Sequence, residues 1–283
     1  MSLELCILAS GSTGNSAVLR TPGGVVLIDA GIGPRTTARR LSGTGVSLAD
    51  VRAICLTHLD RDHFSPTWLR SIVKFGIRLF CHNRRREQLR SDIRRFGGGD
   101  MSIETFDGHP FEPAEQVRFR PIRLAHDEWG SHGFLIEGFG CRVGYATDLG
   151  RVPEALLEHF CGVDVLAMES NYDPDMEVRS SRPWFLKKRI MGGKGHLSNE
   201  QAFHAIRSIL DRCRASSQRM PQHIVLLHRS QECNCPKLLR RLFETDRRIA
   251  PRLTLAEPYE RSMWLSVEKR RQPLVGEQLR LPI

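Results

Sequence analysis

The sequence has no apolar run long enough to cross a bilayer, so a membrane-spanning helix is not expected. Residues 1–9 have no basic segment ahead of an apolar core, and this argues against a signal peptide. The eight cysteines are scattered, and Cys6, Cys55 and Cys81 lie inside apolar stretches. Such cysteines are typical of reduced core residues, not of a disulfide framework. We therefore expect a cytoplasmic protein with no membrane partner.

Internal repeats and a clear domain boundary are also lacking. At 283 residues the chain can bury a sizeable core, and a hydrophobic share of 40% places it with ordinary globular proteins. We expect a single domain over residues 1–260, followed by a C-terminal strand and a basic tail over residues 261–283. The composition leaves the oligomeric state open.

Acidic residues are too few to balance the basic ones. The chain has 42 lysines and arginines against 32 aspartates and glutamates, a formal net charge of +10. The basic residues cluster in the ranges 35–40, 84–95, 187–189 and 269–271. This excess suits a phosphate-backbone partner, because each neutralised phosphate releases counterions. A solvated surface in an arginine-rich protein explains the charge equally well, so both interpretations stay open.

Short apolar runs separated by turn residues predict an α/β protein. Strands are predicted over residues 3–9, 16–19, 25–28, 53–56, 78–81, 117–124, 133–136, 142–146, 163–168 and 223–227, with an edge strand over 263–267. Helices are predicted over residues 36–41, 66–75, 84–96, 200–215 and 236–243. Residues 173–181 are polar, and we expect them to form an irregular insert or lid.

Four potential metal ligands stand within six residues, in the segment Thr-His-Leu-Asp-Arg-Asp-His at positions 57–63. They are His58, Asp60, Asp62 and His63, and they follow the buried strand predicted over 53–56. A turn between a strand and a helix can direct alternate side chains at one point, as a metal centre needs. The alternative is a helix N-terminus whose acidic residues complement the helix dipole, beside two incidental histidines.

Three more candidates, His126, Asp148 and His228, each follow an apolar strand-like run. Taken singly, a histidine in such a place is more often a hydrogen-bonding loop residue than a ligand. Together with the cluster at 57–63, they form a repeated scheme of ligands on loops at one edge of a β-sandwich. The sequence therefore predicts a metal centre gathered from distant parts of the chain.

This scheme resembles the metallo-β-lactamase fold, whose signature is His-x-His-x-Asp-His, over residues 3 to about 240. The resemblance implies a four-layer αββα sandwich that binds two divalent metal ions. The ligands that it implies are His58, Asp60 and His126 for one ion and Asp62, His63 and His228 for the other, with Asp148 bridging both.

One position departs from the family pattern. Asp60 stands where the family usually has a histidine, so a harder carboxylate oxygen replaces an imidazole nitrogen. We therefore expect Mn2+ or Mg2+ to be favoured, with Zn2+ and Fe2+ as alternatives. Asp29, which ends the strand predicted over 25–28, resembles the acidic residue that braces the metal-binding loop in this family without touching metal. A simple turn former would look the same in the sequence.

Several short runs are similar to those of the YycJ/WalJ-type exonuclease group of this family. They are Leu-Ala-Ser-Gly-Ser-Thr-Gly-Asn at 8–15, Ala-Thr-Asp-Leu-Gly at 146–150, Glu-Ser-Asn at 169–171, Arg-Pro at 182–183 with Leu-Lys at 186–187 and Arg-Ile at 189–190, Gly-His-Leu-Ser-Asn at 195–199, and Leu-His at 227–228 with Ser230. Any single match would be unspecific, but their common order is specific. The resemblance implies a metal-dependent phosphodiesterase, a nuclease with 5′-exonuclease activity on DNA.

The candidate catalytic residues are Asp62, in the metal cluster, and His196. As a histidine near this position does in RNase Z-like relatives, His196 would protonate the leaving group or contact a phosphate. The alternative is that His196 caps the helix predicted over 200–215. The candidate substrate contacts are Lys187, Lys188, Arg189, Ser198 and Asn199, the last two at a helix N-terminus. Trp184 would either stack on a base or belong to the core.

These observations favour a cytoplasmic phosphodiesterase that uses a dinuclear metal centre to activate water, with DNA preferred over RNA as its substrate. A second hypothesis is a small-molecule metallohydrolase acting on a lactone, thioester or β-lactam, which the basic clusters disfavour. A third is a catalytically weakened nucleic-acid-binding module. The complete set of other ligands makes the third unattractive, although Asp60 keeps it open.

Overall fold

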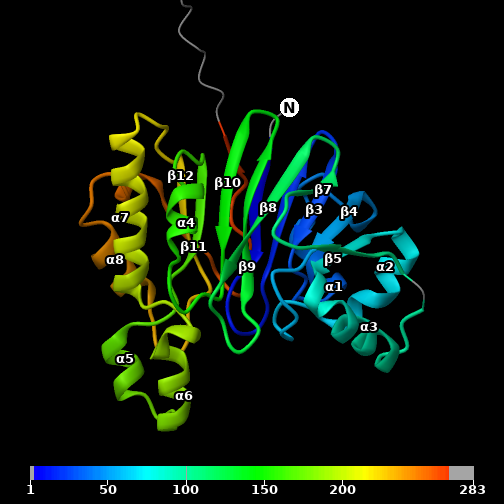
Figure 1. Ribbon diagram of the computed structural model, residues 1–283, viewed down its shortest axis with the longest axis horizontal. Coiled ribbons are helices and arrows are strands. Elements are labelled where there is room, and N and C mark those ends of the chain that lie inside the picture. The colour runs from blue at the N-terminus through cyan, green and yellow to red at the C-terminus, as the bar shows by residue number, and fades with distance from the viewer. Residues whose placement is uncertain (1–2, 100, 268–283) are drawn as a thin grey trace, which may run out of the picture.

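Two seven-stranded mixed β-sheets pack face to face (Figure 1). The computed structural model describes residues 3–99 and 101–267. The first sheet contains β1 (Glu4–Ala9), β2 (Ser16–Thr21), β3 (Gly24–Ile28), β4 (Val51–Cys55), β5 (Arg78–His82), β6 (Ile103–Phe106) and β14 (Leu265–Ser266). The second contains β7 (Phe111–Ala114), β8 (Val117–Leu124), β9 (Ser131–Gly138), β10 (Cys141–Ala146), β11 (Val165–Glu169), β12 (His223–Leu227) and β13 (Leu253–Leu255).

Each sheet is antiparallel on one side and parallel on the other. The first has the strand order β14-β1-β2-β3-β4-β5-β6 and the second the order β13-β12-β11-β10-β9-β8-β7. A tight turn joins β2 to β3 as an antiparallel hairpin, in which Thr21 pairs with Gly24. The strand expected at 263–267 lies at the edge, where β14 pairs antiparallel with β1. Strands β3 to β6 and β10 to β13 are parallel, so their carboxyl ends meet at one edge of the sandwich.

Helices cover both outer faces of the sandwich (Figure 1). The first sheet is covered by α1 (Pro34–Leu41), α2 (Leu69–Phe75) and α3 (Arg86–Arg95), and the second by α4 (Glu154–His159), α7 (Asn199–Ala215) and α8 (Pro236–Phe243). Two further helices, α5 (Pro174–Arg179) and α6 (Trp184–Arg189), project below the second sheet in this view. None of the helices in the described part of the chain is long and apolar enough to span a membrane.

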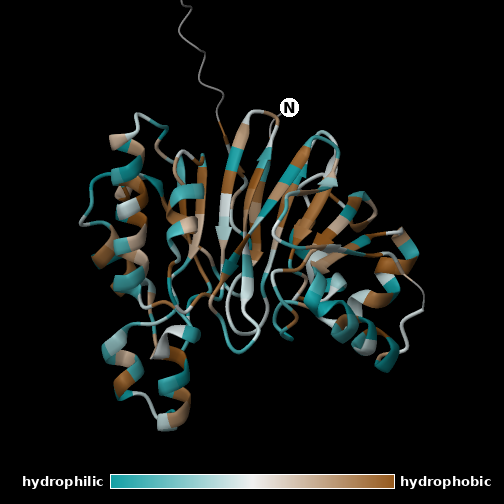
Figure 2. Ribbon diagram, viewed as in Figure 1, coloured by the Kyte–Doolittle hydropathy of each residue, from teal (hydrophilic) through white to brown (hydrophobic). Residues whose placement is uncertain are grey.

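Three apolar layers separate the four layers of secondary structure. One fills the space between the sheets and includes Phe119 and Phe134. The second joins the β10–β12 face to α4, α7 and α8, for example through Ile206. The third joins the first sheet to its helices, for example through Trp68. The hydropathy colours of Figure 2 follow this pattern, with apolar residues along the strands and alternating colours on the helices. The αββα sandwich is thereby confirmed.

The expectation of an irregular insert at 173–181 is wrong, because this segment contains α5. The Asp173 side chain accepts a hydrogen bond from the Met176 N–H, and Pro174 occupies the first helical turn, where its missing N–H costs nothing. Strands β6, β7 and β13 and helices α4 and α6 were not predicted. The basic tail expected up to residue 283 lies outside the described residues from 268 onwards.

Candidate metal centre

The predicted ligands come together at the edge where the carboxyl ends of the parallel strands meet. The loop after β4 carries His58, Asp60, Asp62 and His63. Asp148 follows β10, His228 follows β12 directly, and His126 follows β8. The first sheet thus supplies one part of the cluster and the second sheet supplies the other.

Ligand atoms of these residues lie within 4.8 Å of one another in overlapping groups. Three groups contain predicted ligands alone: His58 with Asp60 and His126; Asp62 with His63 and His228; and His58 with His63 and Asp148. A fourth joins Asp148 and His228 to Glu169 and His196. The first two are the sets expected for two separate ions. Asp148 lies between them, with Oδ2 2.9 Å from His63 Nε2 and Oδ1 4.0 Å from His126 Nε2. This position suits a bridging carboxylate.

Each of the four histidines among the predicted ligands has a neighbour within hydrogen-bonding distance of its Nδ1 atom. His63 Nδ1 lies 2.8 Å from the Asp29 carboxylate, and His126 Nδ1 lies 2.9 Å from the Gly195 carbonyl. His58 Nδ1 lies 3.0 Å from the Thr57 hydroxyl. His228 Nδ1 lies 3.0 Å from the Glu169 carboxylate. Such partners fix the tautomer and leave Nε2 for a metal, so the donor set fits a pair of divalent ions.

Asp29 contacts the loop that carries the predicted ligands at two of its residues, Thr57 and His63. Its buried carboxylate accepts hydrogen bonds from the Thr57 N–H at 2.8 Å and from the Thr57 hydroxyl, in addition to its contact with His63. One carboxylate therefore orients both the start of the loop and one of its ligand rings. Asn15, in the loop between β1 and β2, also holds this loop, because its N–H donates a hydrogen bond to the Asp62 carbonyl at 2.6 Å.

The backbone is strained at the centre. Asp29, Asp127, Asp148 and His228 have positive φ angles between 44° and 58°, a left-handed conformation that is uncommon for residues with a side chain. At Gly31 a Cβ atom would lie 1.7 Å from the Asp62 carbonyl oxygen, so only glycine fits beside the ligand loop. The fold holds these conformations because they turn the ends of several strands toward one point.

The negative charges of the buried carboxylates in the cluster need positive charge close by. Burial alone would lower the pKa of His63, but the carboxylates of Asp148 and Asp29 raise it well above its usual range. Burial likewise opposes the charged form of His228, yet Asp148, Asp62 and Glu169 raise its pKa to about 10. Without metal, protons on the imidazoles therefore neutralise the carboxylates. Divalent cations would supply the same positive charge and displace these protons.

Asp60 occupies the open side of the centre. Its side chain is 45% exposed, and Oδ2 lies 3.8 Å from His58 Nε2. The departure from the family histidine is thus located at the mouth, where a carboxylate can still reach the His58 and His126 group. Burial raises the pKa of Asp60, so this carboxylate too favours a nearby cation.

His196 lies beside the cluster and is held there by Glu169. His196 Nδ1 is 2.7 Å from Glu169 Oε1 and 3.5 Å from Asp148 Oδ1, and the side chain is 21% exposed. Ser198, not His196, caps α7, since its side chain accepts a hydrogen bond from the Gln201 N–H. The helix-capping alternative for His196 is therefore wrong.

Glu169 is the site residue that the sequence analysis did not single out. It ends β11, is fully buried, and contacts both His196 and His228 through Oε1. Its other oxygen accepts a hydrogen bond from the Leu149 N–H at 2.9 Å. The sequence did offer a signal for Glu169: a carboxylate that ends an otherwise apolar strand, when other predicted strands also end at site residues.

The predicted substrate contacts do not share one environment. Lys187 is buried, and its ammonium donates hydrogen bonds of 2.7 Å to the carbonyls of Val178 and Ser180. Asn199 is also buried and contacts the Ser170 hydroxyl. For Lys187, Ser198 and Asn199, this geometry replaces the expected phosphate contact with a structural role, because their polar groups already have protein partners.

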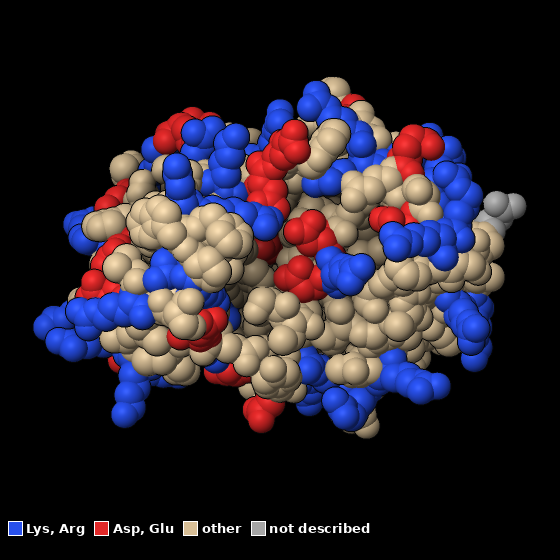
Figure 3. Space-filling model, turned by 90° about the horizontal axis from the view of Figure 1, so that it is seen from below, with Lys and Arg blue, Asp and Glu red and all other residues tan. Residues whose placement is uncertain are grey.

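Lys188 and Arg189 are exposed, and Arg189 lies near the centre. The Arg189 guanidinium donates to both carboxylate oxygens of Asp127, at 3.0 and 2.5 Å, beside the ligand His126. Trp184, at the start of α6, is 69% exposed, so the structure excludes the core interpretation for it. Seen from below, this side of the molecule has acidic side chains around a central hollow and lysines and arginines around them (Figure 3).

The loop at 192–195 is closely packed on one side, while Gly192 and Lys194 are exposed. A Cβ atom at Gly195 would lie 2.4 Å from the Arg189 carbonyl oxygen, and one at Gly150 would lie 2.4 Å from the Gly193 backbone. The His196 N–H donates to the Ile190 carbonyl at 3.0 Å. His196 is therefore positioned by a tight backbone crossing and not by a loose loop.

Comparison with known proteins agrees with this geometry. Residues 25–224 match the family described as beta-lactamase superfamily domain. The chain is 24% identical over 256 residues to exodeoxyribonuclease YycJ of Bacillus anthracis, covering 85% of this chain and 87% of the relative. It is 29% identical over 244 residues to exodeoxyribonuclease WalJ of Streptococcus pneumoniae strain D39, covering 84% and 86%.

A solved structure shares the fold. The metallo-beta-lactamase fold protein YhfI from Bacillus subtilis superposes with a TM-score of 0.66 and 12% identity, over 93% of this chain and 99% of that protein. The buried histidine and aspartate clusters, the paired seven-stranded sheets and the match over residues 25–224 lead to one assignment. This chain belongs to the metallo-β-lactamase superfamily and has the buried cluster of a metal-dependent hydrolase.

Proposed function

We propose that the protein is a metal-dependent phosphodiesterase that removes nucleotides from the 5′ end of DNA. One observation carries the proposal: a sunken cluster of metal ligands opens onto a face rimmed by lysines and arginines (Figure 3). A polyanionic substrate would be attracted by the rim and its phosphate neutralised at the centre. The exodeoxyribonuclease names of the two relatives support the same substrate class.

The proposed division of labour follows from the geometry. When bound, two divalent cations would lower the pKa of a water molecule and neutralise the charge that builds up on the phosphate. Asp62, with its side chain 26% exposed in the cluster, orients the attacking water and accepts its proton. His196 gives a proton to the leaving oxygen, because Glu169 keeps this imidazole charged and oriented. Burial opposes that charge, but Glu169 and Asp148 raise the pKa of His196 above its usual value.

Among the basic residues, Lys188 and Arg189 are the proposed contacts to the DNA backbone. Arg189 is 60% exposed while paired with Asp127, so a phosphate can share its guanidinium. The hard oxygen of Asp60 at the mouth favours Mn2+ or Mg2+ over Zn2+.

The proposal is tested with metal-stripped protein reloaded with each cation in turn. Oligonucleotides labelled at the 5′ or the 3′ end should release the 5′ label first, as a mononucleotide, in the presence of Mn2+ or Mg2+. An RNA strand of the same sequence should be cleaved more slowly. Hydrolysis of lactone, thioester or β-lactam substrates without any cleavage of DNA would contradict the proposal and favour a small-molecule hydrolase.

A further inference from the structure

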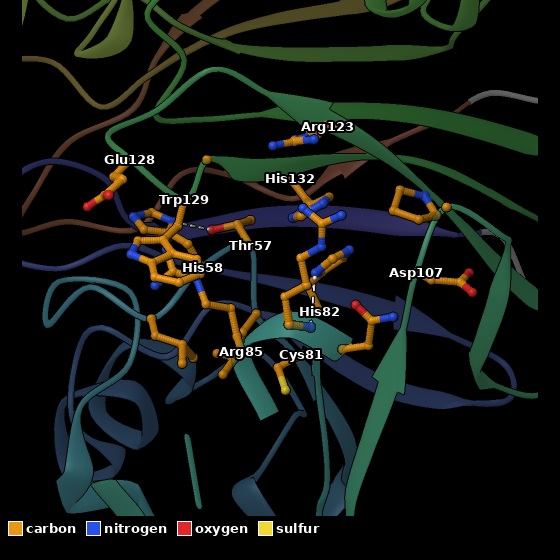
Figure 4. A pocket seen from close by; sticks show the side chains of 17 residues that line it. Thr57, His58, Cys81, His82, Arg85, Asp107, Arg123, Glu128, Trp129 and His132 are labelled. Carbon is orange, nitrogen blue, oxygen red and sulfur yellow. Dashed lines mark hydrogen bonds between the residues drawn. The ribbon is translucent and has the colours of Figure 1, made fainter. Parts of the chain in front are cut away.

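A cavity of about 520 Å3 opens beside the candidate metal centre, between the two sheets (Figure 4). Thr57 and His58 form part of its wall, so the cavity and the ligand loop share a boundary. In Figure 4, Arg123 and His132 lie above His82. None of the residues that line this cavity is used in the chemistry proposed above, apart from His58.

Two stacked histidine rings form part of the cavity wall. His82 and His132 stack nearly in parallel, with ring centroids 4.4 Å apart and planes at 15°. Both rings meet Phe106 edge-on, at 5.7 and 5.5 Å, and Phe106 in turn stacks on Phe111 in the core between the sheets. These contacts tie one wall of the cavity to the core and so fix the positions of both histidine rings.

The lining carries an excess of positive charge. Arg84, Arg85 and Arg123 face only two acidic residues, Asp107 and Glu128. Asp107 is already engaged by the His109 N–H at 2.7 Å. Within the described residues, the Arg84 and Arg123 guanidinium groups have no hydrogen bond or ion pair, so both are free to bind an anion.

The histidine pair adds hydrogen-bonding capacity without adding charge. Burial is the main cause that lowers the pKa of His132, to about 3, and burial together with the nearby arginines also lowers the pKa of His82. Both rings are therefore neutral near pH 7. Their nitrogens and the arginines form a mixed set of partners, typical of sites that recognise a phosphate and its ester oxygen.

Trp129 forms an aromatic wall at the opening. Its side chain is 60% exposed, and the Arg85 guanidinium lies 5.4 Å from the centre of its ring. An exposed indole beside a cation is suited to stacking on a nucleobase, which contributes about 1–3 kcal/mol in single-strand binding. The cavity thus offers a base-stacking surface next to an anion-binding lining.

We propose that this cavity binds the 5′-terminal nucleotide of the substrate strand, with its terminal phosphomonoester on Arg84, Arg85 and Arg123 and its base against Trp129. The proposal rests on the proposed function for the polarity of the strand. Because His58 lies at the boundary, a nucleotide seated here places the next phosphodiester at the metal centre. Recognition of a terminal phosphomonoester would favour cleavage at the end of the strand, as an exonuclease requires.

The test compares two oligonucleotides of one sequence, one with a 5′-phosphate and one with a 5′-hydroxyl. We expect kcat/KM of the metal-loaded protein to be about tenfold or more higher for the phosphorylated strand, since charge-assisted hydrogen bonds are at stake. Arg123→Gln should bring this ratio close to one. Arg118→Gln is the matched control, because Arg118 lies on the same strand, β8, is exposed, and is not part of the cavity. It should retain the wild-type ratio.

A binding measurement separates this proposal from the proposed function. Calorimetric titration of the metal-loaded protein with deoxyadenosine 5′-monophosphate should show binding that Arg123→Gln weakens about tenfold and Arg118→Gln does not. Deoxyadenosine without phosphate should bind more weakly to the wild type. If no DNA is cleaved but these binding differences appear, the proposed function fails and the nucleotide site stands. A wild-type ratio of one, an unchanged ratio in Arg123→Gln, or equal binding by both variants overturns the site.

Discussion

Glu169 Oε1, on a fully buried side chain, lies 2.7 Å from Nδ1 of the partly exposed His196. The contact joins the end of β11 to the turn before α7, two segments 27 residues apart. A buried carboxylate in this position both orients the imidazole and keeps it protonated. His196 is therefore prepared to act as an acid toward a group that reaches its exposed side.

The first prediction concerns His196→Ala. If His196 protonates the leaving oxygen, turnover should fall by about a hundredfold or more while the metal content stays unchanged. Turnover and metal content are measured on the same preparation. Ser198→Ala is the control, since it removes the α7 cap and should cost about 1 kcal/mol of unfolding free energy with nearly normal turnover. Nearly normal turnover in His196→Ala would remove this residue from the proposed chemistry.

The second prediction concerns the mouth of the centre. Asp60→His should shift the metal preference toward Zn2+, because an imidazole nitrogen replaces a hard oxygen next to His58. Activity and bound metal are measured for Mn2+, Mg2+ and Zn2+ in parallel. An identical metal profile for the variant and the wild type would mean that Asp60 does not determine the metal.

The third prediction concerns the brace. Asp29→Asn removes the charge that holds His63 Nδ1 and should weaken metal binding by about ten- to a hundredfold. Competition with a chelator measures the affinity. Thr57→Val offers a graded comparison, because it removes a hydroxyl partner of Asp29 while the Thr57 N–H bond remains. If Asp29→Asn and the wild type bind metal equally, the brace is not required.

The fourth prediction concerns pH in metal-free protein. The folded-state pKa of His228 is about 10, above its ordinary value of 6.5, so its stabilising contribution is present below pH 6.5 and lost as pH rises toward 10. The melting temperature of the chelator-treated protein should therefore fall through this window. Metal-loaded protein should show the opposite trend at the lower end of the window, because binding displaces protons. A flat melting profile in both forms would contradict the assigned charges.

The fifth prediction separates two adjacent lysines. Lys187→Met should lower the free energy of unfolding by about 1–3 kcal/mol, because two carbonyls lose their partner. Lys188→Gln should instead weaken DNA binding and reduce its salt dependence by about one counterion. Melting curves and binding at several salt concentrations distinguish the two. Reversed effects would restore Lys187 as a phosphate contact.

The ligand loop was predictable from sequence because its chemistry is local. His58, Asp60, Asp62 and His63 lie within six residues, directly after an apolar strand. Residues this close in the sequence stay close in the folded protein, since one turn after a strand keeps their side chains together. The four layers were likewise predictable from apolar runs and the resemblance that they support.

Other parts depended on tertiary contacts that the sequence does not display. Glu169 became a site residue only because β11 lies between β10 and β12, whose ends carry Asp148 and His228. Lys187 and Lys188 look alike in the sequence. Lys187 is the buried one because its ammonium donates hydrogen bonds to the carbonyls of Val178 and Ser180. The α5 helix was different, because Asp173 and Pro174 form a recognisable start that the polar composition obscured.

Each proposed ion takes ligands from both sheets, since the loop after β4 belongs to the first sheet and the residues after β8, β10 and β12 belong to the second. An ion bound there would link the two halves of the sandwich to each other. Neither half alone presents a complete ligand set. High-affinity metal uptake during refolding would therefore coincide with the docking of the halves, and chelation would loosen the sandwich first at this edge.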